Sequence, residues 1–139
     1  MLDVTHILKD AYLVAASDPG LIDDNDAIIN LGEGLVEGHL VVDVSAIEID
    51  SNDELYRIAL EGSSSQSFLS GTVDLAILEL GASEVLGGDG GTHPDSSIGR
   101  YIIPFRTERN GVIYPYVRLY ITVSGTVATG INFTAYLAK

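Results

Sequence analysis

The segment RYIIPFRTERNGVIYPYVRLYITV, residues 100–123, decides the fold because it holds the strongest strand and turn signals of the chain. Its two arms, 100–107 and 112–123, are rich in β-branched and aromatic residues, which favour strands. Asn110-Gly111 lies between the arms, and this pair readily takes the left-handed conformations of a two-residue hairpin turn. We therefore predict a β-hairpin in which residues whose numbers add up to 221 lie opposite each other.

This register gives the hairpin two different faces. One face is aliphatic and suits a core, whereas the other combines tyrosines, a phenylalanine and an arginine, which are enriched among the anchors of protein interfaces. The predicted partner-binding residues are Tyr101, Phe105, Tyr114, Tyr116, Arg118 and Tyr120. A competing interpretation packs these side chains inside the protein. Pro104 and Pro115 lack the N–H that a ladder uses, so at least one arm is expected to be an edge strand or bulged.

Alternation of apolar and polar residues predicts more strands on both sides of this hairpin. The further segments with this pattern are residues 40–49, 55–60, 73–77 and 131–138. Six to eight short strands separated by turn residues predict an all-β fold, a jelly-roll-like sandwich or barrel. Neither a repeat nor a boundary divides the chain, so we expect a single β domain over residues 1–139.

Two segments are predicted to lie outside the sheets. Val4, Ile7, Leu8 and Tyr12 fall near a helical spacing, so residues 1–20 are expected to form an N-terminal arm or short helix. The glycine-rich stretch 87–97 cannot continue a strand, and we expect it to be a surface loop.

Composition and charge exclude several kinds of partner. The chain has no cysteine, which removes disulfides and thiolate metal sites. It has no apolar run of about 18 residues, and its first residues do not resemble a signal peptide, so we expect synthesis in a cytoplasm without export by this route. The net charge is −13, with −12 in residues 1–61 and −1 in 62–139. This field repels nucleic acid and anionic membranes, and neither is an expected partner.

The sequence offers little that catalyses a reaction. No nucleophile elbow, phosphate loop or zinc-protease motif is present. A triad of His93, Asp95 and a serine is the one arrangement that remains open, and surface residues are the favoured interpretation. Acidic clusters at 23–26 and 50–54 carry oxygen ligands that suit calcium, but neither matches a twelve-residue calcium loop, and ordinary turns are favoured. We expect neither an enzyme nor a cofactor.

The last third of the chain resembles the small cement, or decoration, proteins of tailed phages. The resemblance is carried by YVRLYITVSGT at 116–126 and GINFTAYL at 130–137. In that family a strand of the form aromatic-x-Arg-Leu-Tyr-x-x-x-x-Gly precedes a return strand rich in Thr and Ala. The opening is also similar, with Asp18 after an amphipathic start and Ile29-Asn30-Leu31-Gly32 beyond an acidic loop. The loop 87–97 and the turn 106–112 have no counterpart in the family pattern.

The resemblance implies a structural virion protein with a jelly-roll-like barrel. It implies a homo-dimer or homo-trimer on the outer surface of an icosahedral capsid, bound to the major capsid protein. By bridging neighbouring subunits, such a protein resists the pressure of packaged DNA. The alternative from the residues alone is a β-sandwich that binds a carbohydrate or receptor, with or without calcium, through exposed tyrosines. The absence of tryptophan argues against that alternative.

Overall fold

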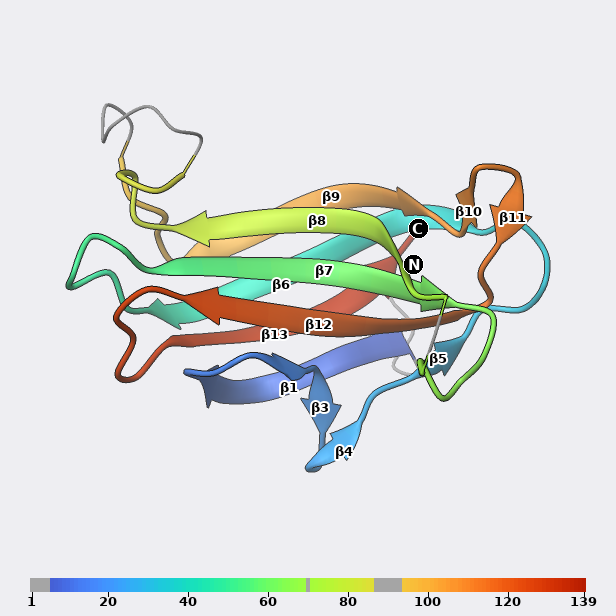
Figure 1. Cartoon of the computed structure of the whole chain (residues 1–139), viewed down its shortest axis with the longest axis horizontal. Coiled ribbons are helices and arrows are strands. Elements are labelled where there is room, and N and C mark those ends of the chain that lie inside the picture. The colour runs from blue at the N-terminus through green and yellow to red at the C-terminus, as the bar shows by residue number, and fades with distance from the viewer. Residues whose placement is uncertain (1–5, 70, 87–93) are drawn as a thin grey trace.

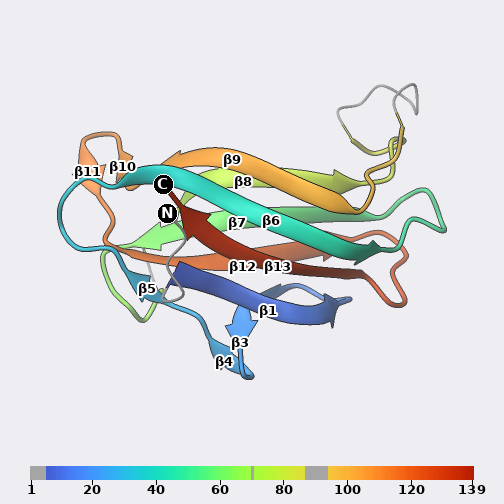
Figure 2. The same ribbon diagram turned by 180° about the vertical axis from the view of Figure 1, so that it is seen from behind.

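The computed structural model describes residues 6–69, 71–86 and 94–139, and it is built from antiparallel strands. Two sheets face each other across a hydrophobic core (Figures 1 and 2). The prediction of an all-β sandwich is confirmed, and the described residues contain no α-helix. No described helix is therefore long and apolar enough to cross a membrane.

The two sheets draw their strands from distant parts of the chain. Sheet A has the order β1 (Ile7–Val14), β13 (Ile131–Ala138), β6 (Glu37–Ile47) and β9 (Gly99–Arg106). Sheet B has the order β2 (Asp18–Pro19), β12 (Tyr116–Ser124), β7 (Leu55–Ser63) and β8 (Val73–Gly81), and β5 (Ile29–Asn30) also pairs with β12. Two small ribbons are formed by β3 (Leu21–Ile22) with β4 (Asn25–Asp26) and by β10 (Glu108–Arg109) with β11 (Val112–Ile113).

The core forms where the apolar positions of the two sheets meet. Along β13 every second residue is buried, and β12 alternates in the same way over most of its length, as the period of a strand with one solvated face requires. The largest fully buried hydrophobic side chains are Tyr56, Phe133, Leu8, Leu40, Ile58, Leu60, Leu119, Ile121, Ile131 and Val42. Both sheets contribute to this set, so the hydrophobic contacts hold the two layers together.

The predicted strands are present with shifted ends. Residues 131–138 form β13 with the predicted bounds, and the strand predicted at 40–49 runs from Glu37 to Ile47. The strands predicted at 55–60 and 73–77 continue further, to Ser63 and Gly81. Alternation located these strands well because each has one face on the core.

Of the two alternatives predicted for the N-terminus, an arm or a short helix, the helix is wrong, because residues 7–14 form β1 and pair with β13. Two register shifts, between Ile7 and Lys9 and between Lys9 and Tyr12, interrupt this strand. Because of these shifts the adjacent residues Leu8 and Lys9 are both buried, so burial along β1 does not follow the two-residue period of a regular strand. Residues 1–5 of the predicted arm lie outside the described residues.

The Asn110-Gly111 turn is confirmed, but the long hairpin predicted around it is wrong. Both residues have the positive φ of the predicted turn, 54° and 82°. Glu108 lies opposite Ile113 and Arg109 opposite Val112, which is the predicted register. Beyond these two pairs the arms separate. The first arm, β9, pairs with β6 in sheet A, and the second arm, β12, pairs with β7 in sheet B.

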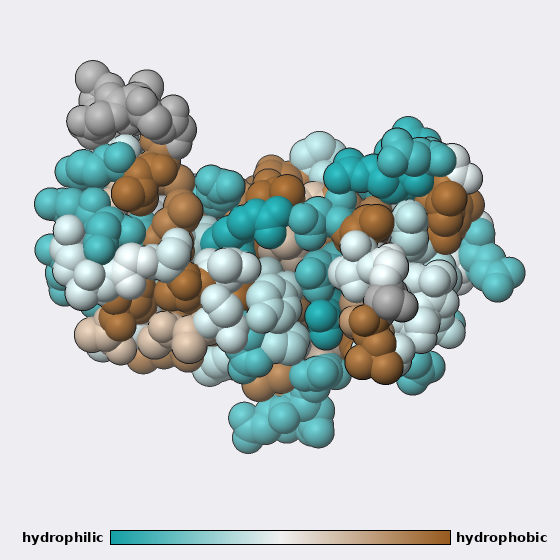
Figure 3. All heavy atoms as spheres, in the orientation of Figure 1, coloured by the Kyte–Doolittle hydropathy of each residue, from teal (hydrophilic) through white to brown (hydrophobic). Residues whose placement is uncertain are grey.

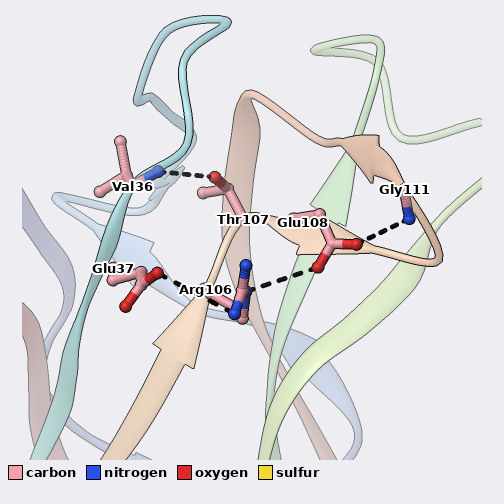
Figure 4. A network of polar contacts seen from close by, with 6 residues as sticks. All are labelled: Val36, Glu37, Arg106, Thr107, Glu108 and Gly111. Carbon is pink, nitrogen blue, oxygen red and sulfur yellow. Dashed lines mark hydrogen bonds and ion pairs between the residues drawn. The ribbon is translucent and has the colours of Figure 1, made fainter.

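Contacts with distant segments explain why the arms separate. The buried Thr107 makes two hydrogen bonds with the backbone of Val36, both at 3.0 Å. Its N–H donates to the Val36 carbonyl, and its side-chain Oγ1 accepts from the Val36 N–H (Figure 4). Pro115 has no N–H for a ladder, and its carbonyl accepts from the Leu31 N–H at 2.7 Å. Each arm therefore bonds to a different part of the chain instead of to the other arm.

Part of the glycine-rich loop can be described. Residues 87–93 lie outside the described residues, whereas 94–97 are placed beside the end of β8. The Asp95 carboxylate accepts from the Ser83 N–H at 2.9 Å, and Ser96 Oγ accepts from the Gly81 N–H at 3.0 Å. These bonds tie the start of β9 to sheet B.

Glu48 fixes the turn between β12 and β13, and it supports a first prediction. Its carboxylate accepts from the N–H groups of Ala128, Thr129 and Gly130 at 2.6–3.1 Å. These bonds lower the pKa of Glu48, chiefly those from Gly130 and Ala128. A carboxylate with a lowered folded-state pKa stabilises the fold above its unfolded pKa, and this contribution is lost as pH falls through the folded value. We expect Glu48→Gln to lower the thermal midpoint at neutral pH, and the difference from wild type to shrink in acid. An equal difference at both pH values would contradict this account.

Candidate functional site

The outer face of sheet B carries three of the predicted partner-binding residues. Tyr116, Arg118 and Tyr120 alternate along β12 with buried core residues and are all partly exposed. Figure 3 looks onto this face, where polar and intermediate side chains fill the middle and hydrophobic side chains gather at both ends. We call the outward side chains of β12, β7 and β8, together with the loop residues that pack on them, the B face.

Arg118 is held at the centre of the B face by three side chains. Its Nε lies 2.9 Å from Oε1 of Glu61, the residue directly opposite on β7, and the two side chains are only 17% and 18% exposed. Its guanidinium also lies 4.5 Å from the centre of the Phe68 ring and 5.7 Å from that of Tyr120. Because its side chain is only 17% exposed and lies between a carboxylate and two rings, Arg118 organises the face rather than projecting from it.

The loop after β7 brings two hydrophobic residues to this face. Phe68 is 7% exposed and lies against Arg118, although its φ of 53° is unusual for an aromatic residue. Its N–H donates to the Ser65 carbonyl at 3.3 Å. The next residue, Leu69, is 87% exposed. The loop thus buries one hydrophobic side chain and presents the other to solvent.

Sequence reasoning missed Phe68 and Leu69 because they lie in a serine-rich loop outside every alternating segment. The available signal was the apolar pair itself, directly after Ser63-Ser64-Ser65-Gln66-Ser67. A hydrophobic pair in such a loop indicates a contact at a distance. The contact partner, Arg118, is far away in the sequence and cannot be identified from local pattern alone.

The remainder of the B face is mixed. Ile77 on β8 is 44% exposed and lies opposite Ala59, which in turn lies opposite Tyr120. Arg57 pairs with Asp74 at 2.8 Å, with both side chains about one-third exposed. The face therefore combines tyrosines and aliphatic residues with ion pairs that are satisfied within the chain.

The other three predicted residues do not belong to this face. Tyr101 is on β9 and packs against the core, and its hydroxyl donates to the Ser97 carbonyl at 2.7 Å. Phe105 is 6% exposed and is part of the core. Tyr114 precedes β12 and packs closely on Gly62. A Cβ atom added to Gly62 would lie 3.0 Å from the Cβ of Tyr114. The prediction that these six residues share one face is wrong, because β9 and β12 lie in different sheets.

A pocket of about 310 Å³ opens between the last strand and the segments that flank β6 and β9. Its walls are mainly apolar, and polar groups come from His6, Glu37 and Lys139. The apolar residues that line it are Leu31, Val36, Phe105, Leu137 and Ala138. Phe105 thus joins the core to this pocket rather than to the B face.

The acidic clusters are used within the chain. Asp23 and Asp24, with φ of 50° and 63°, form the turn between β3 and β4. Glu54 is fully buried and accepts from the N–H groups of Ser51 and Asp53 at 2.7 and 3.2 Å. Among the residues that the structure describes, no three histidines or carboxylates are grouped in a way that could hold a metal ion. His93, the base of the triad left open above, lies outside the described residues.

No protein-family model matches the chain, and no curated protein matches it. The function is therefore argued from the fold, the B face and the resemblance of the last third of the sequence.

Proposed function

We propose that this chain is a structural virion protein, a cement or decoration protein on the outer surface of an icosahedral phage capsid. In this proposal it binds the major capsid protein through the B face and bridges neighbouring subunits. The observation that carries the proposal is the arrangement of Tyr116 and Tyr120 on either side of a fixed arginine. The exposed Leu69 directly follows Phe68, which packs on that arginine. Tyrosines on a sheet together with an exposed hydrophobic side chain of a neighbouring loop are suited to another polypeptide surface.

The strand order supports the jelly-roll part of the proposal. If β2 and β5 are counted as one interrupted strand, the two sheets of the described residues contain eight main strands. Their order along the chain is then 1-8-3-6 in sheet A and 2-7-4-5 in sheet B. This is the order produced by two successive Greek keys, the jelly roll found in viral capsid proteins and also in lectins. The fold therefore agrees with both the cement proposal and the carbohydrate alternative. Binding experiments with variants of the B face distinguish between the two.

The direct test uses purified, expanded capsids that lack a decoration protein. We expect the wild-type protein to bind them to saturation, and the double substitution Tyr116→Ala and Tyr120→Ala to weaken binding about thirtyfold, because truncated interface anchors typically cost about 2 kcal/mol or more. We expect Leu69→Ala to weaken binding about tenfold, since one leucine buries less area than two tyrosines. Co-sedimentation with capsids across a concentration series measures both effects.

Glu33→Ala is the matched control, because Glu33 is exposed in the loop between β5 and β6 and belongs to none of the strands β12, β7 and β8. It should bind as the wild type does, and all variants should keep the thermal midpoint within a few degrees. Failure of the wild type to bind saturating capsids would refute the proposal. Binding to a panel of glycans, lost in the double tyrosine variant, would instead support the carbohydrate alternative.

A further inference from the structure

The outer face of sheet A, here the A face, carries an apolar row across all four strands. The strand registers place Ile7 opposite Tyr136, Tyr136 opposite Val41, and Val41 opposite Ile102. Val41 is only 4% exposed although it points away from the main core, and Ile102 at the edge is 56% exposed. Leu13, on β1, adds another hydrophobic side chain that is 53% exposed. In Figure 2, which looks onto this sheet, no described segment crosses the face.

The A face is neutral in a strongly acidic protein. Its strongest ion pair joins Arg100 to Asp43 through two hydrogen bonds. Arg100 Nε donates to Asp43 Oδ1 at 2.7 Å, and Nη2 donates to Oδ2 at 3.1 Å. A second pair on these four strands joins Arg106 to Glu37, its register partner, at 3.9 Å, and Glu108 of β10 approaches the same guanidinium at 3.4 Å (Figure 4). The two pairs cancel, whereas the whole chain carries −13. Because the charges are already paired within one copy, this face can approach a surface without exposing an uncompensated charge to it.

We propose that the A face binds a second copy of this chain through a twofold axis. Two molecules of net charge −13 repel each other over most of their surfaces, and a neutral, apolar face is where they can meet. Four strands spaced about 4.8 Å apart and about 26 Å long give roughly 500 Å² for each copy. Two such faces bury roughly 1,000 Å², which meets the lower limit of about 1,000 Å² for a biological interface. The sheets of the two copies then stack face to face, as sheets do within a sandwich.

Ile102→Asp tests the interface, with Ile77→Asp as the matched control. Both isoleucines are exposed and lie on edge strands, Ile102 on the A face and Ile77 on the B face. By sedimentation velocity over a wide concentration range, we expect the wild type and Ile77→Asp to be dimers. We expect Ile102→Asp to raise the dimer dissociation constant about thirtyfold or more, because it buries an unpaired charge.

A second experiment does not depend on the folding of a charged variant. The chain has no cysteine, so Tyr136→Cys on a central strand of the A face introduces a single thiol, and Ile77→Cys does the same on the B face. A short bis-maleimide should cross-link the Tyr136→Cys protein into dimers and leave the Ile77→Cys protein uncross-linked. The proposal is overturned by a monomeric wild type, by equal cross-linking of both proteins, or by an Ile102→Asp dimer as stable as wild type. A monomer whose capsid binding is lost in Ile102→Asp would assign the A face to the capsid instead.

Discussion

Arg118→Ala is expected to lower the free energy of unfolding by about 2 kcal/mol, a large effect for one surface-strand residue. The substitution removes the partner of Glu61 and leaves that carboxylate, only 18% exposed, without its ion pair. It also removes the guanidinium that lies against the Phe68 ring. Breaking a buried ion pair costs about 3–5 kcal/mol and an exposed one about 0–1, so a pair that is mostly covered lies between these values. Denaturant unfolding followed by circular dichroism measures the change.

Arg57→Ala is the control for this prediction, because Arg57 lies on the same face and makes the same kind of contact. Its pair with Asp74 has a shorter separation, 2.8 Å, but its side chains are 33% and 32% exposed. If burial determines the effect, Arg57→Ala costs less than about 1 kcal/mol. If the two variants lose the same free energy of unfolding, the more buried environment of Arg118 does not strengthen its ion pair. A double-mutant cycle of Arg118→Ala with Glu61→Ala isolates the energy of the pair itself.

The Arg118 substitution also separates two roles for the B face. In wild type, Phe68 is fixed against the arginine and Leu69 follows it into solvent. Without the arginine, the loop loses its contact with β12, so capsid binding should weaken even though Leu69 is unchanged. Arg118→Ala should then add little to a protein that already carries Leu69→Ala. Additive losses would indicate that the arginine contacts the capsid directly.

The local features of the fold were predictable from the sequence, and the pairing of its strands was not. Alternation identified β13 with its bounds, because a strand with one buried face must repeat every two residues. The Asn110-Gly111 turn was predictable because few residue pairs take two left-handed conformations. The partners of β9 and β12 depend on bonds such as that between Thr107 and Val36, which no local pattern encodes.

The candidate site divides in the same way. The outward positions of β12, Tyr116, Arg118 and Tyr120, follow from alternation along a single strand. Assigning Phe105 to the same face required the pairing of β9 with β12, and that assumption failed. The contact of Phe68 with Arg118 connects a loop to a strand that lies far along the chain, so only the folded structure reveals it. β1 was missed for a different reason. Its register shifts interrupt the two-residue alternation by which the other strands were recognised.

Lys9 gives the second large prediction, because it is a fully buried lysine and, among the residues that the structure describes, no carboxylate is bonded to its ammonium group. Its side chain is 0% exposed, and Nζ donates to the carbonyls of Asp10, Tyr12 and Phe133 at 2.9, 3.0 and 2.6 Å. The same nitrogen lies 3.7 Å from the centre of the Tyr12 ring and 4.2 Å from that of Phe133. Every ammonium proton can thus be bonded, but the charge has been removed from water.

Burial lowers the pKa of Lys9 from 10.5 to about 8, and the nearby Asp10 opposes this shift. Between these two values the unfolded chain keeps a proton that the folded chain has released, so the stability of the fold rises with pH. We expect the free energy of unfolding to increase by about 1.5 kcal/mol between about pH 8 and about pH 9.5. This window ends below the range in which the raised pKa of Tyr56, about 12, acts in the opposite direction.

Lys9→Met is the variant that checks this assignment, because it fills similar volume and cannot titrate. The difference in free energy of unfolding between wild type and Lys9→Met should change by about 1.5 kcal/mol across the same pH range, which cancels the effects of all other titrating groups. If the variant does not fold, the ¹³C shift of the Lys9 Cε in the wild type reports its titration directly. A pKa near 10.5 in that experiment would mean that water reaches the ammonium group and that the bulge between β1 and β13 is open in solution.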